Sequence, residues 1–140
     1  MAKAAKARKI IAAALSKGKA DEMQPLAVVV VDAGGHVVAS ERHDGASPGR
    51  MKIAEAKAYG VVMLGLAGGP QMERAESQAY FTNAINGVFD GKMVPVPGGV
   101  LLRDKKENII GAVGVSGDSS ENDVAAALAG AEAAGLTAEA

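Results

Sequence analysis

The sequence contains no cysteine and no tryptophan, and its 140 residues carry almost no excess charge. The absence of cysteine excludes disulfide bonds, thiol nucleophiles and cysteine-bound metal sites. The 15 basic and 16 acidic residues leave no positive surplus for nucleic-acid binding, and the 3% of aromatic residues offer few rings for stacking on bases. Because 49% of the residues are hydrophobic, the chain can bury a core. We therefore expect one globular domain, residues 1–140, with no nucleic-acid partner.

The N-terminal segment has basic residues followed by a short apolar patch. The patch at residues 10–15 is shorter than the ~7 residues that a signal peptide requires. No run approaches the ~18 apolar residues of a membrane span. The apolar and basic positions of residues 3–17 instead fall on different faces at helical spacing, which predicts an amphipathic helix that ends at Gly18. We expect a cytoplasmic protein without a membrane partner.

Two pairs of strand-like runs are joined by short connections. Residues 25–31 and 36–42 flank the turn Asp32-Ala33-Gly34-Gly35, and residues 100–103 and 109–115 flank a five-residue link. Connections this short join antiparallel strands, because a parallel crossover needs a dozen residues or more. The run PLAVVVV at 25–31 does not alternate, which predicts a central strand that is buried on both faces.

The remaining segments have helical spacing. We expect a helix over residues 50–66 that ends at Gly68-Gly69-Pro70, a short helix within 71–85, a loop-rich stretch over 86–99, and a final helix over 121–134. Asp118, Ser119 or Ser120 can cap the last helix. Two hairpins around a helical excursion predict an α+β fold in which helices cover an antiparallel sheet.

Few side chains suggest chemistry. His36 follows the Gly-Gly turn, and we interpret it as an exposed turn residue. His43 lies beside Asp44 at a strand end, where it could act as an acid/base or as a metal ligand, or could simply be a loop residue. Arg50 and Lys57 are seven residues apart, on one helix face, and could bind a carboxylate. No cluster of histidines and carboxylates indicates a metal site.

Three of the four aromatic rings lie close together in the sequence, at Tyr80, Phe81 and Phe89. The nearby segment Val94-Pro95-Val96-Pro97-Gly98-Gly99 is either a strand-entry loop or the rim of a pocket. If the protein holds a flat ligand, we expect it between these rings and Pro97, Gly98 and Gly99.

Three segments together resemble the GlcG/HbpS family, the haem-degrading domain family that also supplies the C-terminal domain of PduO-type corrinoid adenosyltransferases. They are PLAVVVVDAGGHVVASERHDGA (25–46), PVPGGVLLRD (95–104) and NIIGAVGVSGDSSENDVAAALAG (108–130), with IAEAKAYGVV (53–62) between them. The resemblance implies a profilin-like antiparallel sheet of about five strands, with helices on both faces, and a homo-oligomer.

The resemblance also implies binding of haem or a related tetrapyrrole. His36 and His43 are the two imidazoles of the sequence, and His43 is a possible ligand of a haem iron. Arg42 and Asp44 match the Arg-x-Asp-Gly pattern of the family, whereas His43 stands where an apolar residue is usual. Arg50 is likewise a departure, and the two together favour a small anionic ligand. One alternative is therefore an enzyme for a small carboxylated metabolite, with His43 as acid/base and Arg50 and Lys57 as a carboxylate clamp. Another is an oligomeric accessory subunit without chemistry of its own.

Overall fold

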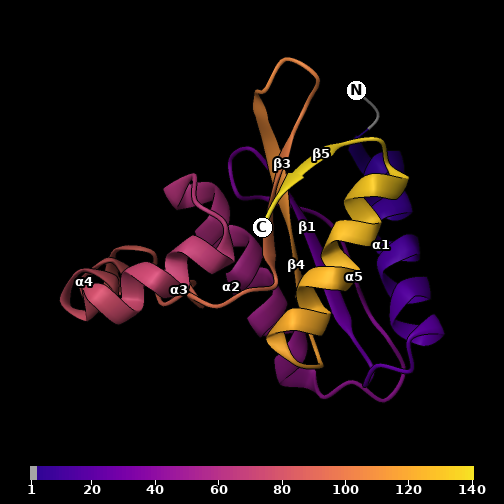
Figure 1. Ribbon diagram of the computed structural model, residues 1–140, viewed down its shortest axis with the longest axis horizontal. Helices are drawn as coiled ribbons and strands as arrows, with labels where there is room; N and C mark the ends of the chain where they lie inside the picture. Colours follow the sequence, from indigo (N-terminus) through magenta and orange to yellow (C-terminus); the bar gives the residue numbers. More distant parts are fainter. Residues whose placement is uncertain (1–2) are drawn as a thin grey trace.

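The computed structural model describes residues 3–140, which form five helices and five strands. In chain order these elements are α1 (Lys3–Ala20), β1 (Ala27–Asp32), β2 (Val37–Arg42), α2 (Pro48–Leu64), α3 (Gly68–Ser77), α4 (Ala79–Val88), β3 (Gly99–Arg103), β4 (Ile109–Ser116), α5 (Ser120–Ala133) and β5 (Thr137–Glu139). Figure 1 shows the sheet in the middle, with helices on both sides. None of the helices in this range is long and apolar enough to cross a membrane.

The five strands form one antiparallel sheet in the order β2-β1-β4-β3-β5. β1 pairs with β2 and β4, and β3 pairs with β4 and β5. Both predicted hairpins are therefore confirmed. The two strands of the first hairpin have different surroundings, since β1 is central and β2 lies at an edge.

The core has two layers, one on each face of the sheet. Val28 and Val30 of β1 pack in the cluster that contains α1 and α5, whereas Val29 and Val31 pack in the cluster beneath α2. Because successive residues of a strand point to opposite faces, both sets are buried, which explains why this run does not alternate. The expected α+β fold, with helices on both faces, is confirmed (Figure 1).

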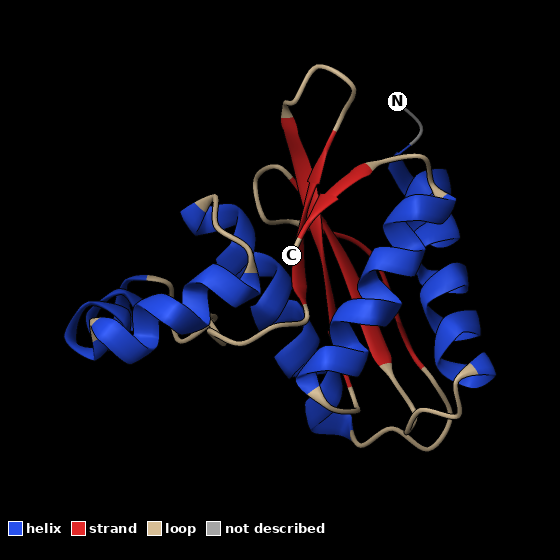
Figure 2. Cartoon of the chain, in the orientation of Figure 1, coloured by secondary structure: helices blue, strands red, loops and turns tan. Residues whose placement is uncertain are grey.

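The pair α3–α4 extends away from the sheet (Figure 2). α4 packs against α3. Residues 79–89 include no charged side chain, and Tyr80 and Val88 are 73% and 72% exposed. Within this helical arm, α4 therefore presents an uncharged surface to its surroundings, with Tyr80 and Val88 as its exposed large side chains.

Two expected helix ends are wrong, and both involve glycine. α1 continues past Gly18, which is buried within the helix. Leu26 packs so closely against Gly18 that an added Cβ would lie 2.7 Å from Leu26 Cδ1. Gly18 therefore permits close packing instead of ending the helix. α2 ends at Leu64, and Gly65 is its C-cap residue with a left-handed backbone (φ 63°). Gly68-Gly69-Pro70 instead begins α3.

Two further elements differ from the expectation. The segment 71–85 lies in two helices, because the non-helical backbone of Gln78 (φ −138°, ψ 59°) separates α3 from α4. α4 then continues to Val88. β5 was not predicted, since its three residues lack any strand pattern. It forms by pairing with β3, where Leu102 lies opposite Ala138.

Candidate functional site

A buried ion pair joins three elements at one end of β4. Lys57 of α2 donates from Nζ to Asp123 Oδ2 of α5 at 3.1 Å and to Val115 O of β4 at 2.9 Å. Asp123 Oδ1 accepts a third bond from the Asp118 N–H, at 3.0 Å. Burial raises the pKa of the Asp123 carboxyl, although the Asp118 N–H and Lys57 act in the opposite direction. The carboxylate that Lys57 binds is therefore the protein's own.

The Pro97-Gly98-Gly99 turn lies directly over this ion pair. Gly98 has φ 122°, and a Cβ at this position would lie 2.7 Å from Lys57 Nζ. The carbonyl of Gly98 accepts a hydrogen bond from the Val115 N–H at 2.9 Å. The turn is thus a packed backbone segment in which glycine is required by both its dihedral angle and its contacts.

Arg50 reaches the same end of the sheet but makes a separate contact. Its Nη1 donates to Ser116 Oγ at 3.3 Å. Among residues 3–140, no hydrogen bond or ion pair joins His43 to Arg50 or to Lys57. The three side chains of the expected enzyme site therefore do not form one connected group.

The Arg42-His43-Asp44 segment is exposed at the end of β2. The Arg42 guanidinium donates to the carbonyl of Ala46, which closes the loop locally. His43 and Asp44 line a cavity of about 240 Å³ near the end of α1, together with Lys19. This cavity lies apart from the Lys57–Asp123 pair, and His43 is its one imidazole.

His36 is an exposed residue of the first hairpin turn, as expected. Asp32 Oδ1 accepts the backbone N–H groups of Gly34 (2.9 Å) and His36 (3.0 Å). These bonds hold the pKa of the Asp32 carboxyl below its ordinary value. The DAGG segment is therefore an Asp-stabilised turn.

A second cavity of about 240 Å³ lies between the end of α2, the α3–α4 arm and the loop that precedes β3. Its lining is mainly apolar and consists of Leu64, Leu66, Gln71, Arg74, Phe81, Thr82, Ile85, Met93 and Pro95. We call it the arm cavity. It includes two parts of the sequence where a flat ligand was expected, namely the 80–89 segment through Phe81 and the proline segment through Pro95.

The polar groups of the arm cavity are few and distinct. The Arg74 guanidinium lies 4.1 Å from the centre of the Phe81 ring, a cation–π contact. Gln71 is buried, and its Nε2 donates to Leu66 O at 2.8 Å. The cavity therefore offers one exposed cation beside an aromatic ring and an apolar wall.

The remaining predicted residues lie elsewhere. Tyr80 does not line the cavity and is 73% exposed on α4. Phe89 packs edge-on against Tyr59 of α2, with ring centres 6.4 Å apart, and Lys92 lies 5.6 Å from the centre of the Tyr59 ring. Phe89 thus anchors the loop to α2 and does not line the arm cavity.

Of the residues that line the arm cavity, Phe81 alone was a predicted site residue, and those that were not predicted include Gln71, Arg74 and Met93. Gln71 and Arg74 are three residues apart, which places them on one side of α3, but that spacing alone indicates only a polar face. Met93 is buried against Gly60 of α2, where a Cβ would lie 3.0 Å from Met93 Cγ. Asp123 was also missed, because its partner Lys57 is 66 residues away in the sequence.

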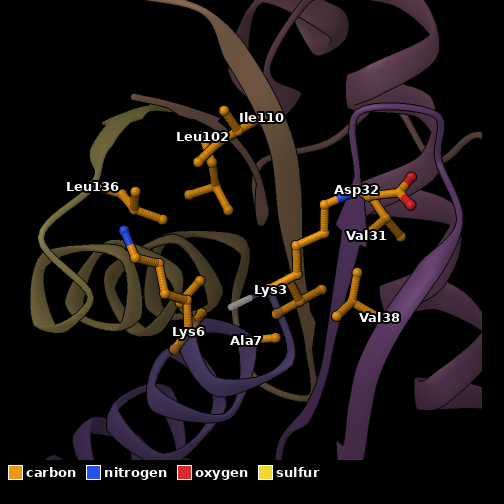
Figure 3. A pocket seen from close by; sticks show the side chains of 11 residues that line it. Lys3, Lys6, Ala7, Val31, Asp32, Val38, Leu102, Ile110 and Leu136 are labelled. Atoms are coloured by element: carbon orange, nitrogen blue, oxygen red, sulfur yellow. The ribbon is translucent and has the colours of Figure 1, made fainter. Parts of the chain in front are cut away.

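A smaller cavity of about 30 Å³ lies where α1 meets the sheet. Figure 3 shows Lys3, Lys6 and Asp32 around it, together with apolar side chains such as Leu102 and Ile110. It is too small for a ligand larger than a few water molecules. Residues 3–140 contain no group of three or more histidines and carboxylates that could hold a metal ion.

Several solved structures share this fold. The crystal structure of a PduOC–haem complex is 24% identical, with a TM-score of 0.84 over 94% of each chain. The crystal structure of HbpS is 25% identical, with a TM-score of 0.80 over 92% of this chain and 86% of that one. Klebsiella pneumoniae protein ORFY is 25% identical, with a TM-score of 0.84 over 94% of this chain and 89% of that one.

No curated protein sequence matches the chain. The family model described as "Haem degrading protein HbpS-like" matches residues 3–132, which is nearly the whole chain. This match agrees with the sequence resemblance in the hairpin and glycine motifs. The chain belongs to the HbpS-like family of haem degrading proteins.

Proposed function

We propose that this protein binds a flat, largely apolar ligand with an acidic group, of the tetrapyrrole class, in the arm cavity. The observation that carries the proposal is the pairing of Arg74 with Phe81 at an otherwise apolar wall. An aromatic ring can stack on a macrocycle, and a guanidinium can bind a carboxylate. The family match and the structural relative that was crystallised as a haem complex support the same ligand class.

Haem itself fits this wall in part. The apolar side chains suit its ring, and Arg74 suits a propionate. Neither histidine of the chain lines the arm cavity, and the sulfur ligand available to iron there is the buried Met93. Ring and carboxylate contacts therefore dominate binding, and iron adds little to the affinity.

The size of the arm cavity favours a site that is shared between subunits. Its volume of about 240 Å³ is below the roughly 300–1,000 Å³ of pockets that enclose drug-sized ligands. A tetrapyrrole would therefore extend beyond it, over the uncharged α4 helix with its exposed Tyr80 and Val88. The protein forms a homo-oligomer in which a second copy covers this apolar surface.

Titration with hemin and with protoporphyrin IX tests the proposal. Both should bind with similar affinity, as seen in the Soret band and in porphyrin fluorescence. Arg74→Gln should weaken both by about 10- to 100-fold, because a charge-assisted hydrogen bond is lost. Phe81→Ala should weaken both as well, whereas Lys9→Gln, at an exposed lysine of α1, should leave the affinity unchanged.

His43→Ala distinguishes ligand binding in the arm cavity from binding in the cavity that His43 lines. If this substitution abolishes hemin binding while Phe81→Ala does not, the ligand occupies the cavity beside His43 and the proposal is wrong. If neither compound binds the wild-type protein, tetrapyrroles are excluded as the ligand class. A strong preference for hemin over protoporphyrin IX would contradict the minor role of iron.

A further inference from the structure

β2 is an edge strand of the sheet. It pairs with β1, and among residues 3–140 the sheet order places no strand on its other side. It is six residues long and mostly exposed, whereas β5 at the opposite edge has three residues. Free edges of this length are templates for another strand unless they are covered, shortened or broken by proline.

The hydrogen-bond pattern identifies which backbone groups are free. The His43 N–H donates to Leu26 O, the residue before β1, at 2.9 Å. The backbone of His43 therefore points toward the β1 side. Along an antiparallel strand, the backbone N–H and C=O groups of successive residues point alternately toward the partner strand and away from it. Glu41 and Ala39 therefore also face β1, and the N–H and C=O groups of Ser40 and Arg42 point outward from the sheet.

A groove of about 500 Å³ follows this edge. It touches four consecutive β2 residues, from Val38 to Glu41. The register shift between β1 and β2 leaves Val38 as an extra residue, and Val38 and Ala39 both pack on the α1 face of the sheet. The groove therefore lies between α1 and β2 on that face and reaches the β2 backbone at Ser40. Its opposite wall is a stripe of α1, and the residues of that stripe are Ala4, Arg8, Ile11 and Ala12. The middle of the groove is thus apolar, and an added strand could place side chains in it.

The charge of α1 restricts what the groove can accept. The described helix has six basic residues and no acidic residue: Lys3, Lys6, Arg8, Lys9, Lys17 and Lys19. Within residues 3–140, Lys17 alone among them forms an ion pair, with Asp21. Arg8 is exposed at the α1 wall of the groove and forms no ion pair within the described part of the chain, and Glu41 is the one acidic residue of the groove, on the β2 wall. The α1 wall, with its six basic residues on one helix, therefore attracts negative charge.

A second copy of the chain fits this charge poorly. Antiparallel pairing of two β2 edges about a twofold axis perpendicular to the sheet places both α1 helices on the same face, beside the junction. Their positive charges would then repel each other. An acidic peptide in extended conformation has the opposite charge and the same backbone hydrogen-bonding capacity.

We propose that the β2 edge binds an extended acidic peptide segment of a partner protein, which adds to the sheet as a sixth strand. Backbone groups of the peptide pair with Ser40 and Arg42. An apolar side chain packs between Ile11 and Ala39, and a carboxylate side chain binds Arg8. This site is distinct from the arm cavity, on the opposite edge and face of the molecule.

The test is selection of a random linear-peptide display library on the full-length protein, followed by synthesis of the enriched peptide. The enriched sequences should alternate apolar and polar residues and should be acidic. Affinity is measured by fluorescence anisotropy. Ser40→Pro should weaken binding about tenfold or more, since it removes an outward N–H. Because that N–H does not pair with β1, the fold should persist. Ser40→Ala is the matched control and should bind normally.

Two further experiments test the proposal if Ser40→Pro does not fold. A peptide with N-methyl groups at alternate residues loses its strand hydrogen bonds and should not bind. Arg8→Glu should weaken binding about threefold or more, whereas Lys9→Glu, which is exposed but outside the groove, should have a smaller effect. The proposal is overturned by a lack of enrichment, by a basic consensus, by unaffected binding to Ser40→Pro, or by a dimer of the free chain that Ser40→Pro dissociates.

Discussion

Lys57 and Asp123 form an ion pair that is almost completely removed from solvent. Nζ and Oδ2 are 3.1 Å apart, and the side chains are 4% and 2% exposed. Through this pair, α2 on one face of the sheet is joined to the start of α5, which covers the other face. The pair therefore connects the two layers at the end of β4.

Removal of Lys57 should be strongly destabilising. Lys57→Met leaves the Asp123 carboxylate buried without its cation, and we expect a loss of about 3–5 kcal/mol in the free energy of unfolding. Urea denaturation measures this loss. Lys17→Met, which removes an exposed pair with Asp21, is the matched control and should cost about 0–1 kcal/mol.

The double variant Lys57→Met/Asp123→Leu tests the cause of that loss. With both charges gone, no buried ion remains unpaired, so the double variant should recover most of the stability. Equal or additive destabilisation in the double variant would contradict an electrostatic origin and would indicate that packing around the two side chains dominates.

Gly98 should tolerate no side chain. Gly98→Ala adds a Cβ 2.7 Å from Lys57 Nζ at φ 122°, so it combines backbone strain with a clash. Gly91→Ala is the control, since Gly91 has φ 76° and nothing within 4 Å of the added Cβ. We expect Gly91→Ala to cost about 1–2 kcal/mol and Gly98→Ala clearly more, as measured by thermal unfolding. Equal costs would show that both Lys57 and the Val115 carbonyl, which lies 2.9 Å from the added Cβ, move aside freely.

The Ser119 side chain should contribute to α5 as its N-cap. Ser119 Oγ accepts the N–H of Asn122 at 3.2 Å. Ser119→Ala should cost about 1 kcal/mol in unfolding free energy. Ser120→Ala is the control at the first helical position and should have little effect. If the two variants are equally destabilised, capping by Ser119 is not the cause.

The sequence was sufficient for the elements that are determined by neighbouring residues. The hairpin at 32–36 and the buried run 27–31 follow from turn chemistry and from an unbroken β-branched pattern. Ser119 was one of three candidate caps. Each of these features depends on contacts within a few residues, which is the range over which sequence patterns carry information.

Features that depend on distant residues were missed. Gly18 matches a helix end in the sequence, and only the packing of Leu26 against α1 shows why the helix continues. β5 exists because β3 provides an edge. Lys57 was predicted to bind a carboxylate, but its partner Asp123 lies on another element and could not be identified by spacing.

Acid should weaken the connection between the loop before β1 and the start of α5. The Asp118 carboxylate accepts the N–H groups of Gln24 and Ser119 and the Asn122 Nδ2, each at 2.7 Å. These bonds, with Gln24 as the largest cause, hold the pKa of Asp118 below the ordinary 3.8. Between the folded and the unfolded pKa, the unfolded chain binds more protons, so this contribution to stability is present at higher pH and is lost as the pH falls.

Asp118→Asn tests this contribution, because it keeps the shape but removes the ionised acceptor. The variant should be less stable than the wild type near neutral pH, and the difference should shrink as urea denaturation is repeated at lower pH, from about 7 to about 2. Glu121→Gln, which changes an exposed carboxylate of the same helix, is the control for a general loss of charge near the helix start. The difference in unfolding free energy between wild type and Asp118→Asn could instead stay constant with pH. That result would contradict a contribution from the ionised Asp118 carboxylate as the acceptor of the Gln24 N–H.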